Sequence, residues 1–133
     1  RAAICNVSGD VWIVSGLDAG LENVRWQRFA SGLFQPLGLR IVKDQVYVLG
    51  RDQITRLHDL NNDGEADHYE NFNNDTTITD HYHEFCLGLE TDRAGNFYFN
   101  NSQFSAGNMP VRARVTKGAV TRTMLSPVSV TGG

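Results

Sequence analysis

The sequence lacks the marks of several large protein classes. Its two cysteines form no CxxC pair and no Cys/His zinc spacing, and no CxxCH haem-attachment motif occurs. The GxSxG, HExxH and glycine-rich phosphate-binding motifs are also missing. No run of 18 apolar residues occurs, so no membrane-spanning helix is expected. The 12 basic residues are scattered and the net charge is −3, which argues against a nucleic-acid partner.

The two cysteines, Cys5 and Cys86, each lie in an apolar stretch. Cys5 follows Ile4, and Cys86 stands between Phe85 and Leu87. This setting is typical of buried free thiols. A disulfide between them stays open as an alternative because they are far apart in the sequence, but nothing in their spacing favours it.

What the sequence has in abundance is residues that favour turns. It contains 13 glycines, and asparagine is frequent. The hydrophobic fraction of 41% and the charged fraction of 20% are those of an ordinary globular protein. Many turns in a chain of this composition predict many short strands.

Three segments of the sequence share one pattern, which predicts a repeat. Each has a short strand, a turn rich in Asp, Gly or Asn, and a second strand with an aromatic at its second position. The aromatics are Trp12, Tyr47 and Tyr98, at spacings of 35 and 51 residues. The first spacing is close to the length of a propeller blade. The second is longer by 16 residues, which predicts an insertion within the Asp/Asn-rich stretch 59–80.

Alternating apolar and polar residues predict further strands between and after these hairpins. Each unit then has an inner hairpin and one or two outer strands, which is the plan of a propeller blade. The expected fold is therefore all-β, an incomplete β-propeller of about two to three blades of antiparallel strands in a single domain. Since closure normally takes four to eight blades, we expect a segment of a larger protein. The expected units are about 2–34, 35–80 and 81–125, and the further strands are 24–29, 53–58, 111–115 and 119–124.

The stretch 59–70 matches the full D-x-[DN]-x-[DN]-G-x5-E calcium pattern. Ca²⁺ takes six to eight oxygen ligands, and alternate residues of a tight turn direct their oxygens inward around it. Three interpretations stay open: an EF-hand, a calcium loop between strands, and an Asx-rich turn that binds no ion. The strand-like flanks 54–58 and 69–72 argue against the EF-hand. The predicted ligands are Asp59, Asn61, Asp63, the Glu65 carbonyl, and Asp67 or Glu70.

A small histidine cluster precedes the third hairpin. In an extended chain His81 and His83 share one face, whereas Glu84 points the other way. Such a pair can bind a metal, or one imidazole can act as a general base. The alternative is two loop histidines that are hydrogen-bonded or solvated.

The segments 29–39 and 46–57 resemble a blade of the soluble quinoprotein glucose/sorbosone (aldose sugar) dehydrogenases. The run 59–72 is similar to one subset, the planctomycete-type membrane-bound dehydrogenases, which join such a propeller to a cytochrome c module. The resemblance covers residues 2–101 and implies a periplasmic or secreted protein. It also implies that His83 is the general base while hydride passes to pyrroloquinoline quinone (PQQ). The Arg, Lys and Asn residues that hold the quinone in that family belong to later blades and are absent from this sequence.

Two main functions follow. The first is a segment of an extracytoplasmic β-propeller with a calcium-binding loop, which acts as a structural or interaction module and has further blades or other subunits as partners. The alternative is part of a PQQ-dependent sugar or alcohol dehydrogenase-like oxidoreductase with His83 as general base and a cytochrome c module as partner. A stand-alone calcium-binding module is a third interpretation.

Overall fold

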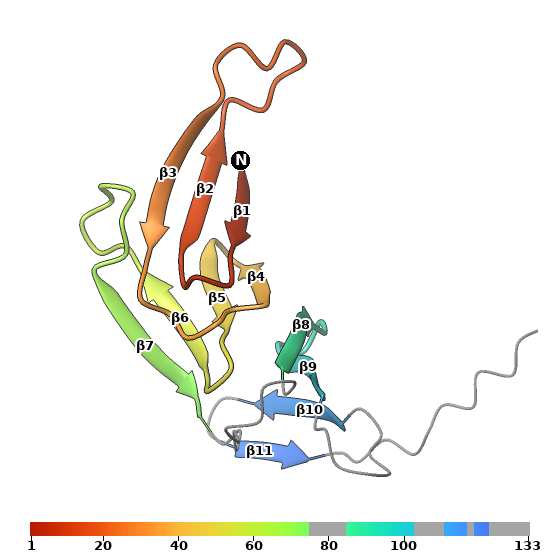
Figure 1. Ribbon diagram of the computed structural model, residues 1–133. Coiled ribbons are helices and arrows are strands. Elements are labelled where there is room, and N and C mark those ends of the chain that lie inside the picture. The colour runs from red at the N-terminus through yellow and green to blue at the C-terminus, as the bar shows by residue number, and fades with distance from the viewer. Residues whose placement is uncertain (75–84, 103–110, 117–118, 123–133) are drawn as a thin grey trace, which may run out of the picture.

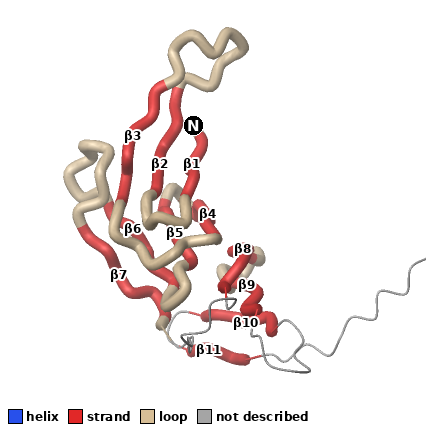
Figure 2. Tube along the Cα trace, viewed as in Figure 1, coloured by secondary structure: helices blue, strands red, loops and turns tan. Residues whose placement is uncertain are grey.

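A computed structural model describes residues 1–74, 85–102, 111–116 and 119–122, and the side chains of 1–74 and 85–100. The strands within these residues form antiparallel β-sheets. Those residues contain no helix, as Figure 2 shows, and hence none long and apolar enough to cross a membrane. The prediction of an all-β antiparallel fold is confirmed.

Three sheets follow one another along the chain, and consecutive strands are neighbours within each sheet (Figure 1). Sheet 1 holds β1 (Ala2–Cys5), β2 (Val11–Ser15) and β3 (Arg25–Ala30). Sheet 2 holds β4 (Gly38–Val42), β5 (Gln45–Leu49), β6 (Ile54–His58) and β7 (His68–Asn73). Sheet 3 holds β8 (Phe85–Thr91), β9 (Phe97–Ser102), β10 (Val111–Thr116) and β11 (Ala119–Arg122).

The predicted hairpins form, and their turns have the chemistry that the sequence indicated. Lys43 and Asp44 link β4 to β5 with φ values of 48° and 61°, as a two-residue type I′ turn requires. The Asp92–Asn96 turn between β8 and β9 is closed by a hydrogen bond from Asp92 N to Asn96 O (3.1 Å). The strands expected near 24–29, 53–58, 111–115 and 119–124 are present as β3, β6, β10 and β11.

Sheet 2 lies between the other two sheets and is buried on both faces. Along β5, Val46 and Val48 contact sheet 1, whereas Tyr47 and Leu49 contact sheet 3, as the alternation of a strand requires. The cluster between sheets 1 and 2 consists of Val11, Ala30, Val46, Val48 and Leu57. The cluster between sheets 2 and 3 consists of Leu49, Ile54, Cys86, Leu89, Phe97 and Phe99.

Both cysteines are free and lie in different clusters. Cys5 packs against the cluster between sheets 1 and 2, and burial raises the pKa of its thiol. The Cys86 Sγ donates a weak hydrogen bond to the carbonyl of Arg51 (3.8 Å). The structure thus has two free thiols and no disulfide between them.

The prediction that Trp12 and Tyr47 are equivalent is wrong. A register shift lies at Val11/Trp12 between β2 and β3, and the same shift lies at Ile54/Thr55 between β6 and β7. Every residue pair between β2 and β3 has its counterpart 43 positions later, between β6 and β7. The pair Trp12–Arg28, for example, corresponds to Thr55–Asn71. Strands β1, β2 and β3 therefore correspond to β5, β6 and β7.

This register narrows the predicted insertion to the later part of the stretch 59–80. The acidic loop 59–67 has a counterpart of equal length in residues 16–24, since both connect corresponding strands. The acidic loop is therefore an ordinary connection of the repeat. The extra residues lie between β7 and β8, where the chain is longer than between β3 and β4.

Candidate functional site

The acidic loop connects β6 to β7 and holds its own carboxylates in place. Asp59 accepts backbone hydrogen bonds from Asp63 (3.2 Å) and Gly64 (2.9 Å), one on each carboxylate oxygen. Asp63 Oδ1 accepts one from the backbone of Glu65 (2.9 Å). Each carboxylate has about four lone-pair sites, so these bonds leave acceptor capacity for a further ligand.

Asp67 closes the loop from its far end. Its Oδ2 accepts hydrogen bonds from the backbone N–H groups of Leu60 (2.7 Å) and Asn61 (3.3 Å). The Asn61 Nδ2 lies 3.2 Å from Asp63 Oδ2 and 3.4 Å from Asp67 Oδ1. A donor group with partial positive charge thus lies between two carboxylates, at the place where a cation would relieve their repulsion.

The loop also joins sheet 2 to sheet 1. The Gln27 Nε2 on β3 donates to the carbonyl of Asp63 (3.2 Å), and the backbone N–H of Ala66 donates to the carbonyl of Phe29 (2.7 Å). Gly64 has φ +91°, and a Cβ at this position would overlap the Gln27 amide. The outer strand of sheet 1 is therefore bound to the connection of the next sheet, and Figure 1 shows this loop beside β3.

The counterpart loop 16–24 shows what the acidic residues add. Both loops have a residue of positive φ at the corresponding place, Leu21 (52°) and Gly64 (91°). Where the acidic loop has Asp59, Asp63 and Asp67, the counterpart has Gly16, Gly20 and Val24. A connection of this length therefore forms without the three carboxylates, and turn formation alone does not explain them.

The donor set suits Ca²⁺ in chemistry, because it consists of carboxylate, amide and carbonyl oxygens. Asp59, Asn61, Asp63 and Asp67 are the residues that the structure brings together, and Glu65 offers its carbonyl. Within the described part of the chain, no group of three or more His, Cys, Asp or Glu side chains is placed so that it could hold a metal as it stands. Ion binding therefore requires the acidic side chains of the loop to move closer together, and the Asn61 Nδ2 to leave its place between Asp63 and Asp67.

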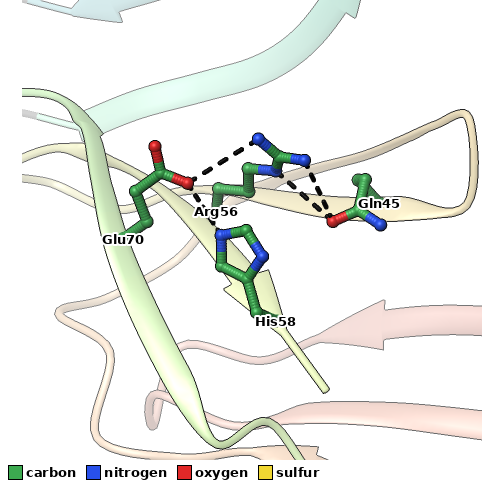
Figure 3. Close-up of polar contacts among 4 residues, drawn as sticks. All are labelled: Gln45, Arg56, His58 and Glu70. Carbon is green, nitrogen blue, oxygen red and sulfur yellow. Dashed lines mark hydrogen bonds and ion pairs between the residues drawn. The ribbon is translucent and has the colours of Figure 1, made fainter. Parts of the chain in front are cut away.

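Glu70, the alternative predicted ligand, has other partners. It lies on β7, and its Oε2 is 2.7 Å from His58 Nε2 and 3.7 Å from Arg56 Nη1 (Figure 3). Arg56 also donates from Nε and Nη2 to Gln45 Oε1 (3.4 and 3.2 Å) and lies over the Tyr47 ring. Strand alternation directs Glu70 to the face of sheet 2 that carries these side chains. We therefore leave Glu70 out of the proposed ligand set.

Sequence reasoning did not identify this polar cluster or the docking role of Gln27. The signal that would have found both is the 43-residue repeat, which aligns Gln27 with Glu70 on corresponding strands. A cleft of about 590 Å³ lies between sheets 1 and 2, and its walls include Gln27, Phe29 and Gly64.

The histidine cluster lies outside the described residues. Neither His81 nor His83, the predicted general base, falls in a described range, and Glu84 does not either.

Comparisons with known proteins add no relatives. No protein-family model matches the chain, and no curated protein or solved structure matches it significantly. The site therefore has to be interpreted from its own geometry.

Proposed function

We propose that this chain is a segment of a β-propeller-type repeat protein, in which the acidic loop binds Ca²⁺ and strengthens the contact between two neighbouring sheets. The sheets succeed one another with β1, β4 and β8 on the same side, and β4 contacts both β1 and β8. A propeller would arrange successive sheets in this order around its axis, so the succession supports the proposal. The module has a structural or interaction role, and further repeat units are its partners.

The observation that carries the proposal is the acidic loop itself. It joins β3 to the connection between β6 and β7, and it has three carboxylates that its counterpart of equal length lacks. Bound Ca²⁺ would supply positive charge that offsets the repulsion among these carboxylates. Asp59, Asn61, Asp63, Asp67 and the Glu65 carbonyl would hold the ion.

The resemblance to extracytoplasmic propellers supports the same proposal. Extracellular calcium modules work with dissociation constants of roughly 10⁻⁴–10⁻³ M, which fits a loop with few charged ligands. The oxidoreductase alternative depends on His83, which lies outside the described residues. We therefore do not carry it further.

The test is the calcium dependence of thermal stability of the full chain. At a Ca²⁺ concentration of 100 times the dissociation constant, we expect a gain of about 2.7 kcal/mol in the free energy of unfolding, seen as a higher melting temperature than in EDTA. Asp63→Ala should remove the difference between the two conditions.

The matched control is Asp18→Ala in the counterpart loop. Asp18 also accepts two backbone hydrogen bonds, from Gly20 (3.2 Å) and Leu21 (3.0 Å), but the loop around it lacks the calcium pattern. This variant should keep the full response to calcium. A wild-type chain that melts at one temperature in Ca²⁺ and in EDTA would refute the proposal.

A further inference from the structure

Among the described residues, sheet 1 has one strand fewer than sheets 2 and 3. Strands β1, β2 and β3 correspond to β5, β6 and β7, and in sheet 2 the strand β4 pairs with β5. In sheet 3 the strand β8 pairs with β9 in the same way. Among the described residues, no strand occupies the corresponding place on the other edge of β1.

The contacts between sheets agree with this correspondence. Strand β8 contacts both β4 and β5, and β1, the counterpart of β5, contacts β4. Figure 1 shows β1 and β4 near each other with the far edge of β1 open. In sheet 2, β4 contacts β8 of the next sheet. No described strand of sheet 1 makes the corresponding contact with β4.

Two side chains of β4 are only partly covered at this place, although Leu39 packs against the cluster between sheets 1 and 2. Leu39 is half-buried, whereas its counterpart Leu89 in sheet 3 is only 3% exposed. Ile41 is 48% exposed and lines the cleft of about 590 Å³ between sheets 1 and 2. An apolar floor next to an unpaired strand edge is a place where a further strand can add.

We propose that the edge of β1 binds an extended strand of the Leu-Gly-Leu type, supplied by a segment outside the described residues. Strands β4 and β8 both carry this sequence, as Leu37-Gly38-Leu39 and Leu87-Gly88-Leu89. The proposal rests on the repeat arrangement of the proposed function and does not depend on calcium.

The backbone groups of β1 favour this pairing. Asn6 N donates to Asp10 O (3.1 Å), so the N–H of Asn6 points toward β2. Because successive N–H groups in a strand alternate in direction, those of Cys5 and Ala3 point to the open edge. The incoming strand therefore meets the N–H groups of Ala3 and Cys5, which point toward it.

The glycine gives the site its selectivity. In sheet 2, a Cβ on Gly38 would lie 3.1 Å from the backbone nitrogen of Leu89 and 3.2 Å from its Cβ. The incoming strand meets Leu39, the counterpart of Leu89, at the same place. A residue larger than glycine there would be crowded against Leu39, so the site favours a strand with glycine between its two leucines.

The test uses a fluorescent peptide with the sequence of residues 36–42, added to the full chain, with binding measured by anisotropy in Ca²⁺ and in EDTA. We expect saturable binding in both conditions. Gly38→Val in the peptide should weaken it by about tenfold or more, the effect of about 1.4 kcal/mol. Ile41→Ser in the protein should weaken it similarly, whereas Leu17→Ser, at a residue 49% exposed in the 16–24 loop, should not.

Two N-methylated peptides test the pairing without any change to the protein. The type I′ turn after Val42 makes Val42–Gln45 and Arg40–Tyr47 hydrogen-bonded pairs, so N-methylation at Arg40 blocks the edge that would face β1. N-methylation at Leu39 blocks only the opposite edge. Equal binding of these two peptides, or no saturable binding of the parent peptide, would overturn the proposal. Binding without any calcium effect on stability would instead refute only the calcium loop.

Discussion

At the scale of single residues, Asp92 shows how one turn uses its side chains. Its Oδ2 accepts hydrogen bonds from Asn96 Nδ2 (2.7 Å) and Tyr98 Oη (2.9 Å), and its Oδ1 accepts one from Asn96 N (2.9 Å). Together these bonds lower the pKa of Asp92 from 3.8 to about 2, and the bond from the Asn96 side chain has the largest effect. In the turn between β1 and β2 an asparagine is the acceptor in place of the aspartate. There the Asn6 Oδ1 accepts a hydrogen bond from Asp10 N.

Asp92 should make stability depend on pH in acid. Its folded pKa is below the unfolded one, so its contribution is complete above about pH 4 and disappears as the pH falls through about 2. Asp92→Asn should flatten this part of the profile when urea midpoints are measured between pH 2 and 6. Asp44→Asn, at an exposed turn aspartate with no described side-chain hydrogen bond, is the matched control. If the urea midpoint of Asp92→Asn fell with pH as steeply as that of the wild type, the result would contradict this role.

At the scale of elements, the connection between β6 and β7 depends on one backbone position. Gly64 combines φ +91° with close approach to Gln27, and its neighbours Asp63 and Ala66 make the bonds to sheet 1. A side chain at Gly64 would therefore disturb both the loop and its docking on β3.

Gly64→Ala should lower the free energy of unfolding by about 1–2 kcal/mol, the usual cost of a non-glycine residue in the left-handed region. Urea denaturation in EDTA measures this without any contribution from calcium. Gly20→Ala is the control, because its Cβ would make only ordinary contacts of 3.6 Å and longer. Equal losses in both variants would contradict a special role for Gly64.

At the scale of the whole molecule, sheet 2 couples the two hydrophobic clusters. Val48 and Leu49 are adjacent in β5 and belong to different clusters, one on each face. Tyr47, Phe72 and Phe97 extend the second cluster with ring centroids 4.7–5.3 Å apart. Loss of packing on one face of sheet 2 therefore weakens the support of the other.

Leu49→Ala should lower the free energy of unfolding by about 2–5 kcal/mol, because Leu49 is 1% exposed and its loss leaves a cavity. The transition should stay single, with the same midpoint by tryptophan fluorescence, which reports sheet 1, and by far-ultraviolet circular dichroism, which reports all sheets. Leu17→Ala, at an exposed leucine, should change the free energy by less than about 0.5 kcal/mol. Two separate midpoints in Leu49→Ala would contradict the coupling.

Local patterns allowed the strands and turns to be predicted. Alternation identified β3, β6, β10 and β11, and turn residues identified the hairpins, because both signals act over a few neighbouring residues. The calcium pattern likewise identified Asp59, Asn61, Asp63 and Asp67 as a group, which the structure brings together. A local motif does not record that a strand begins at His68 and turns Glu70 toward Arg56, so these partners of Glu70 are seen only in the structure.

The sequence by itself determined the all-β class, the hairpin turns and the composition of the acidic loop. Only the tertiary structure decided that Trp12 and Tyr47 are not equivalent, since a change in strand register moves every side chain to the other face. It also decided that the acidic loop docks on Gln27 and Phe29, and that no described strand pairs with the far edge of β1. Contacts between sheets join residues far apart in the chain, so they depend on packing that no local pattern records.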